Sequence, residues 1–201
     1  MELELFRSIS AVFVLATFLL LLGCSPQLDW RTVQSPQERY TALFPGKPEK
    51  LERKIPYQGQ EFSQTLEAVK IDDDIYSIST IQLQPQQTFL APSLMEQLQS
   101  NLLDRAKASG GTVESIDTTY QVGKRQRLPS KDYFITLKSS GNASQWMRVR
   151  WINRASPDGD VWIYQISTLH ASANANANEG DVKTFLSKEA YENFFSDFSP
   201  E

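Results

Sequence analysis

Apolar and polar residues alternate along several segments of this chain, and the alternation predicts β-strands. Residues 62–71 and 75–83 are two such runs, joined across three consecutive aspartates, which favours a hairpin. Residues 145–153 and 161–169 are β-branched and aromatic, and the turn sequence Ser156-Pro157-Asp158-Gly159 connects them. We expect further strands at residues 40–44, 51–55, 113–122 and 133–137.

A helical period replaces the alternation in the middle of the chain. The apolar residues Leu94, Leu98 and Leu102 fall on one helix face, and two glycines at 110–111 mark its end. Ser93 stands three residues before Glu96, which resembles a capping box. The sequence therefore predicts a helix that begins near Ser93.

A second helix is expected near the C-terminus, over residues 181–198. Its apolar residues are Phe185, Leu186, Ala190, Phe194 and Phe195. Antiparallel runs of strands, separated by only two helices, predict an α+β fold in which helices flank an antiparallel β-sheet.

The N-terminal segment has the pattern of an export signal. Residues 9–23 are fifteen residues without a charge, fewer than the roughly 20 that a membrane-spanning helix needs. The run ends in Leu21-Leu22-Gly23-Cys24, which resembles the lipobox of bacterial lipoproteins. Gly23 is the small residue beside the cut, and the thiol of Cys24 would accept a diacylglyceryl group. The alternative is an uncleaved signal anchor with an incidental cysteine.

The resemblance to a lipobox predicts how the chain is divided and where in the cell the protein lies. Residues 1–23 are expected to be a cleaved signal peptide, residues 24–39 a lipidated N-terminus and flexible tether, and residues 40–201 a single domain. Palmitate-type acyl chains on Cys24 would hold the protein on a membrane outside the cytoplasm. Ser25 favours the periplasmic face of the outer membrane, if the host is Gram-negative.

Charge argues against a nucleic-acid partner, and cysteine content argues against disulfides. The chain has 24 acidic and 20 basic residues, a net charge of -4, whereas nucleic-acid-binding proteins normally carry a basic surface. We therefore expect no nucleic-acid partner. Cys24 is the only cysteine, so stability must come from the core and not from disulfides.

The domain sequence also resembles small exported bacterial proteins with a PsbP-like fold. Phe44-Pro45-Gly46-Lys47-Pro48 is similar to their opening motif, and Phe194-Phe195-Ser196-Asp197-Phe198 to their closing one. A helix ending in Gly-Gly and an arginine-rich strand before an aromatic one are similar too. The resemblance implies an α/β/α sandwich around an antiparallel sheet, and a binding or assembly role without catalysis.

The arginine-rich strand contains the candidate ligand-binding residues. Met147, Val149 and Trp151 would face one side and Arg148 and Arg150 the other. Trp146, Arg148, Arg150 and Trp151 could together bind a sugar, a peptide or an anion. Alternatively, the tryptophans pack in the core and the arginines coat the outer face.

Other polar groups predict no catalytic or metal site. His170 is the only histidine, and the sequence around it supplies neither further metal ligands nor a nucleophile. The aspartates at 72–74 lack the spacing of a calcium loop and suit a hairpin turn. The basic residues Lys124, Arg125, Arg127 and Lys131 suit a solvated loop, or contact with anionic lipid. We expect no cofactor.

These features together predict a lipid-anchored cell-envelope protein that acts as a non-catalytic binding or assembly module, with the membrane and an envelope protein as its partners. One alternative is a hydrolase-type envelope enzyme whose pocket the sequence does not reveal. Another is a purely structural envelope protein.

Overall fold

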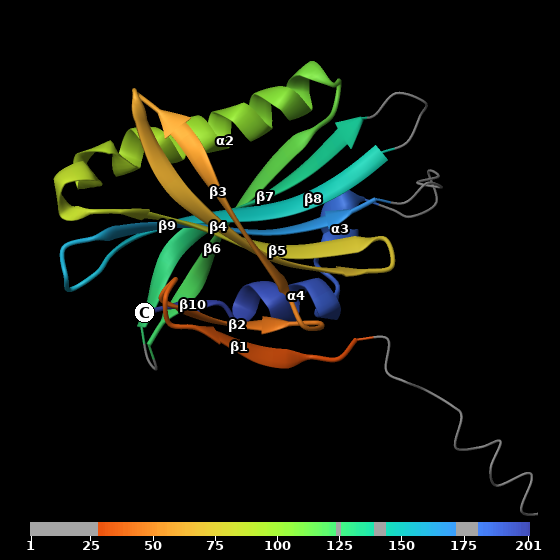
Figure 1. Cartoon of the computed structure of the whole chain (residues 1–201). Coiled ribbons are helices and arrows are strands. Elements are labelled where there is room, and N and C mark those ends of the chain that lie inside the picture. Colours follow the sequence, from red (N-terminus) through yellow and green to blue (C-terminus); the bar gives the residue numbers. More distant parts are fainter. Residues whose placement is uncertain (1–27, 124–125, 139–143, 172–180) are drawn as a thin grey trace, which may run out of the picture.

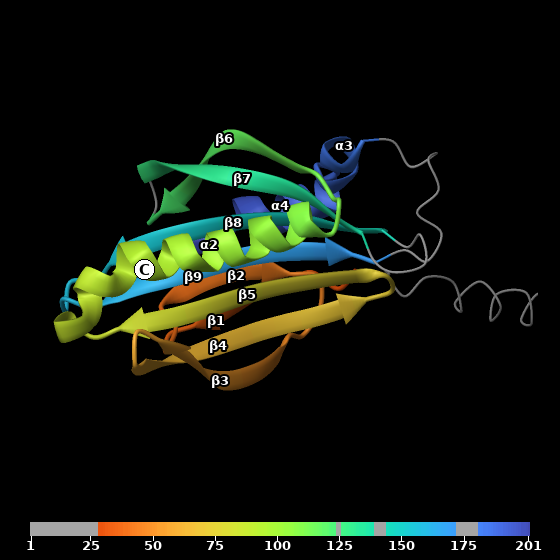
Figure 2. The same ribbon diagram turned by 90° about the horizontal axis from the view of Figure 1, so that it is seen from above.

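The centre of the structure, a computed structural model that describes residues 28–123, 126–138, 144–171 and 181–201, is a seven-stranded antiparallel sheet. Its strand order is β3-β4-β5-β9-β8-β7-β6 (Figure 1, Figure 2). The strands are β3 (Glu49–Tyr57), β4 (Gln60–Ile71), β5 (Asp74–Leu83), β6 (Val113–Val122), β7 (Gln126–Lys138), β8 (Ser144–Ala155) and β9 (Val161–His170).

Each face of this sheet carries its own layer. Helix α2 (Ala91–Ala108), preceded by the 3-10 turn η1 (Pro85–Leu90), crosses one face (Figure 2). The opposite face carries helices α3 (Val182–Leu186) and α4 (Glu189–Ser196) and a small sheet, β1-β2-β10 (Figure 1). The small sheet comprises β1 (Arg31–Ser35), β2 (Tyr40–Phe44) and β10 (Ser199–Pro200). The predicted α+β fold, an antiparallel sheet flanked by helices, is confirmed.

Most of the core lies between the large sheet and the layer of α4 and β2. Phe194 of α4 meets Phe44 of β2 at 5.2 Å and Tyr76 of β5 at 5.4 Å between ring centroids, both edge to face. Tyr40 and Phe198 are fully buried beside them. The closing aromatic run therefore attaches the C-terminal segment to the sheet, because edge-to-face rings add to the gain from burial.

The long hairpins follow the predicted pattern closely. Strands β4 and β5 pair in register from Gln64 opposite Ile81 to Ile71 opposite Asp74, which closes the turn at the aspartates. Asp72 takes the left-handed conformation there, with φ 51°, and aspartate tolerates this better than most residues. The predicted hairpin of β8 and β9 is confirmed as well.

The helix boundaries differ from the predicted ones. Helix α2 begins at Ala91, and the Ser93 hydroxyl donates to the carbonyl of Leu90 at 3.1 Å, so Ser93 lies inside the first turn and is not the cap. The predicted C-terminal helix is two helices, which Ser187 and Lys188 separate. The capping-box prediction was wrong because the turn η1 leads directly into α2.

Part of the segment predicted as a flexible tether, residues 24–39, is a strand. Residues 31–35 form β1, which pairs antiparallel with β2 from Arg31 opposite Phe44 to Ser35 opposite Tyr40. The backbone N–H of Asp29 donates to Pro45 at 3.0 Å, and Trp30 meets Tyr76 edge to face. The chain is therefore packed onto the domain well before Tyr40, because the polar stretch supplies an edge strand. No helix in the described part of the chain is long and apolar enough to cross a membrane.

Candidate functional site

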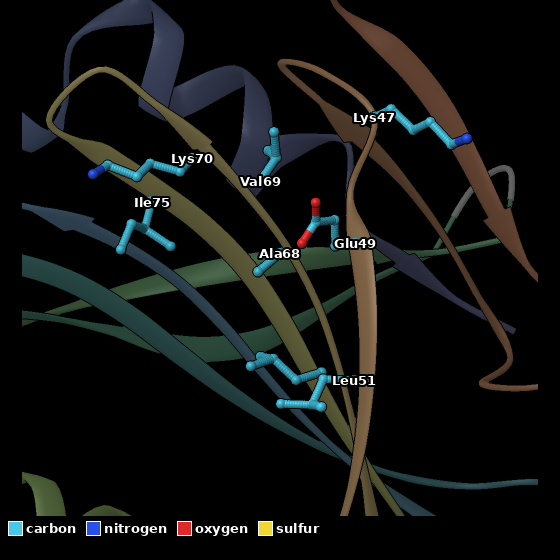
Figure 3. Close-up of a pocket in the computed structure, with 8 residues that line it drawn as sticks. Lys47, Glu49, Leu51, Ala68, Val69, Lys70 and Ile75 are labelled. Atoms are coloured by element: carbon cyan, nitrogen blue, oxygen red, sulfur yellow. The ribbon is translucent and has the colours of Figure 1, made fainter.

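A hollow of about 510 Å³ lies at the open edge of the large sheet, where β3, β4 and β5 end the strand order (Figure 3). Leu51 of β3 stands opposite Leu66 of β4, and Glu49 stands opposite Ala68. Lys70 stands opposite Ile75 of β5 in the same way. Cross-strand neighbours therefore build the floor of this hollow, which we call the edge groove.

The edge groove is apolar with a charged border. Its apolar lining residues are Leu51, Leu66, Ala68, Val69 and Ile75, and its charged ones are Lys47, Glu49 and Lys70. Leu51 is 60% exposed, an unusual state for a leucine in a strand. An apolar floor with a few charges at its border is suited to binding.

The four residues predicted as a ligand face are buried. Trp146, Arg148, Arg150 and Trp151 are each 7% exposed or less. The predicted alternation is confirmed, since Trp151 packs under α2 while Trp146 packs in the core on the opposite face. At these four residues both faces of β8 are covered by protein, so they present no open ligand face. The alternative is right that the tryptophans pack in the core, but the arginines are buried and do not coat an outer face.

Arg148 and Arg150 instead bind one buried carboxylate. Asp132 on the neighbouring strand β7 accepts from Arg148 at 2.6 and 3.0 Å and from Arg150 at 2.6 and 2.9 Å. Asp132 stands directly opposite Arg150 in the sheet. A single carboxylate thus receives four charge-assisted hydrogen bonds, which fixes both guanidinium groups.

The free ends of the two arginines hold the C-terminal helices. Arg148 donates to the Leu186 carbonyl of α3 at 3.2 Å and to Glu192 of α4 at 2.8 Å. Arg150 donates to the Phe195 carbonyl at 2.9 Å. These carbonyls lie at helix ends, where they have no partner within the helix. The cluster therefore joins the sheet to α3 and α4, and its role is to stabilise the fold.

His170 also belongs to a polar cluster. Its Nδ1 lies 2.7 Å from Asp74, and the Tyr191 hydroxyl donates to the same carboxylate at 3.0 Å. Its Nε2 is buried and has no hydrogen-bond partner in the described structure, and its ring packs on Phe185 at 4.6 Å. A carboxylate thus anchors the ring of His170. No group of three potential metal ligands occurs among the described residues.

A third polar cluster gave no signal in the sequence. The Ser35 hydroxyl lies 2.7 Å from Glu38 and 3.0 Å from Glu67, and Tyr40 donates to Glu67. Lys50 pairs with Glu38, and this hydrogen bond raises the pKa of the lysine. Both carboxylates are buried, and both bind Ser35 at the end of β1, a strand that was not predicted.

Burial keeps three core tyrosines protonated. It raises the pKa of Tyr40, and the hydrogen bond to Glu67 adds to the effect. Burial likewise raises the pKa of Tyr76 and Tyr164. Tyrosines in an unfolded chain ionise near pH 10.

We therefore expect alkaline unfolding. Below about pH 10 the three tyrosines are protonated in both states, and their full contribution to stability is present. Above it the unfolded state loses protons first, so stability falls as pH rises. Absorbance at 295 nm should show these tyrosines ionising together with the loss of circular dichroism. Ionisation of all seven tyrosines before unfolding would contradict this.

The other residues singled out in the sequence, those of the basic segment and of the lipobox, form no common cluster among the described residues. Arg127 is exposed on β7, and Lys131 pairs with Asp117 at 3.6 Å. Lys124 and Arg125 lie outside the described residues, as do Gly23 and Cys24. The described part of the basic segment is strand from Gln126 on, so the predicted loop is shorter than expected.

Comparisons with known proteins assign no family to the chain, so its function is argued from the clusters and the groove described above. No protein-family model matches the chain, and no curated protein matches it.

Proposed function

We propose that this protein is a lipid-anchored assembly module of the cell envelope, held on the extracytoplasmic side of a membrane by acyl chains on Cys24. The lipobox-like sequence supports the anchor. The main support is the short connection between the anchor and the domain. The domain is packed from Leu28 and Asp29 on, so only residues 25–27 lie between Cys24 and the packed domain. Four residue steps span about 14 Å at most, so the anchor would hold the domain against the bilayer.

The edge groove is the proposed docking site of this module. It lies at a sheet edge, where strand β3 can accept a partner. A PsbP-like α/β/α fold fits the layering, with α2 on one face and α3 and α4 on the other. The three-stranded sheet beside α4 would be an addition to that plan.

An envelope hydrolase is the second candidate, and the paired His170 and Asp74 favour it. Asp74 also lines a hollow of about 220 Å³ with Tyr191 and Leu28. A general base must present its second ring nitrogen to a nucleophile or water. Nε2 of His170 is buried instead, with the rings of Phe185 and Trp146 beside the imidazole. This geometry supports binding over catalysis.

Site-specific photo-crosslinking in cells tests the proposal. A photoreactive residue in place of Lys70, at the edge groove, should form a defined adduct with one envelope protein. The adduct should disappear with Ala68→Trp, which fills the groove, and in a form exported without the lipid.

The matched control is the same photoreactive residue in place of the exposed Thr119 on β6, at the opposite sheet edge. It should give no such adduct. Identical adducts from both positions, or an adduct that persists in the lipid-free form, would contradict a membrane-localised assembly site.

A further inference from the structure

Strand β3 ends the large sheet and leaves one of its edges open. Among the described strands it pairs only with β4. Residues 49–53 are all exposed, and Leu51 at their centre is one of two large apolar residues exposed in the described structure. An open edge presents unpaired N–H and C=O groups that a further strand can bind.

The sequence of this edge is complementary to itself. Residues 49–53 read Glu-Lys-Leu-Glu-Arg. When a second copy runs antiparallel with Leu51 opposite Leu51, Glu49 meets Arg53 and Lys50 meets Glu52. All four charged pairs are then of opposite sign, and opposite charges across a strand pair stabilise it.

We infer that the partner at the edge groove is a second copy of this chain, joined through antiparallel β3 strands with Leu51 on the two-fold axis. The second copy is thus the partner in the assembly proposed above. The dimer depends on that proposal only for its location at a membrane. A self-complementary surface is what a two-fold dimer requires.

Charge selects this register over its neighbours. Moving the axis to Glu52 sets Glu52 against Glu52 and Lys50 against Lys54. Moving it to Lys50 sets two lysines against each other. Like charges directly opposite destabilise a strand pair, so only the Leu51 register is complementary throughout.

In this dimer the lipid anchors of both copies can reach the same membrane. The two-fold axis of an antiparallel edge pair is perpendicular to the sheet, so both copies turn the same face to the same side. Leu28 and Trp30 contact the face that carries α3 and α4, since Leu28 lines a hollow with Phe185 and Tyr191 and Trp30 packs on Tyr76. Both chains therefore enter from one side, and both anchors reach one bilayer. Leu51 also lines the edge groove, so pairing joins the two grooves.

Disulfide crosslinking of the full chain in cells tests the register. The chain has no other free thiol when Cys24 is acylated. In Leu51→Cys the two Cα atoms would lie about 5 Å apart, within reach of a disulfide. In Lys54→Cys they would lie about 20 Å apart, six residues along the strand. We expect a linked dimer from Leu51→Cys and none from Lys54→Cys.

Charge variants in the Leu51→Cys chain test the pairing further. Glu49→Arg alone or Arg53→Glu alone should lower crosslinking about tenfold, because each sets like charges together twice. Co-expression of the two variants should restore it as a heterodimer, since every pair is again of opposite sign. Lys50 is left unchanged, because it already binds Glu38.

Equal crosslinking of Leu51→Cys and Lys54→Cys, or charge variants without effect, would overturn the dimer. An acylated, membrane-bound chain that does not crosslink at position 51 would overturn the dimer alone and leave the anchor standing. A dimer whose 51–51 disulfide is identified by peptide mass, and whose Cys24 carries no acyl group, would support the dimer and refute the anchor.

Discussion

Asp132→Asn is expected to lower the free energy of unfolding by about 3–5 kcal/mol. The substitution keeps the shape of the side chain and removes its charge. Arg148 and Arg150 are each 2% exposed. Arg148 would keep only the half-exposed carboxylate of Glu192, and Arg150 would lose the one carboxylate it pairs with in the described structure. Buried charges without a partner are among the most destabilising defects in a protein. Thermal unfolding followed by circular dichroism should show a melting temperature lowered by about 10 °C.

Asp117→Asn is the matched control. Asp117 also pairs with a basic residue, Lys131, but its side chain is 93% exposed, so its loss should leave stability nearly unchanged. The triple replacement of Asp132, Arg148 and Arg150 by apolar residues of similar size should recover much of the loss. Equal melting temperatures for Asp132→Asn and Asp117→Asn would refute the structural role of the cluster.

Gly111→Ala should destabilise the protein by about 3 kcal/mol or more. Gly111 follows α2, and a Cβ there would lie 1.8 Å from the backbone oxygen of Thr136 on β7. No side-chain rotation relieves a clash with backbone, so α2 and β7 must separate. Urea denaturation should show a lower midpoint with an unchanged slope.

Gly59→Ala is the comparison for this effect. Gly59 has φ +74°, and a Cβ there meets nothing within 4 Å. It should cost about 1 kcal/mol through backbone conformation alone. A Gly111→Ala protein as stable as Gly59→Ala would mean that the close approach of α2 to β7 is wrong.

The strands that the sequence predicted well are those with one strong local signal. The alternation in β4 and β5, with aspartates at the turn, determines both register and hairpin. Strand β1 escaped prediction because Arg31-Thr32-Val33-Gln34-Ser35 is polar and mostly exposed. An edge strand of this kind forms because a partner strand is nearby, and the partner is brought there by the fold.

The candidate site shows a different limit of the sequence. Alternation along β8 correctly separated Arg148 from Trp151, but it does not reveal what covers each face. Asp132, which binds both arginines, lies sixteen residues before Arg148, and α4 follows far downstream. The edge groove was missed for the same reason, since its residues come together only through the pairing of β3, β4 and β5.

The intact mass of the protein from its own membranes tests the central claim most directly. The proposal predicts a chain that starts at Cys24 and carries acyl groups on that residue, with no acylated product from Cys24→Ala. A wild-type chain that retains residues 1–23, or that starts at Cys24 without acyl groups, would contradict the lipid anchor and with it the proposed membrane assembly.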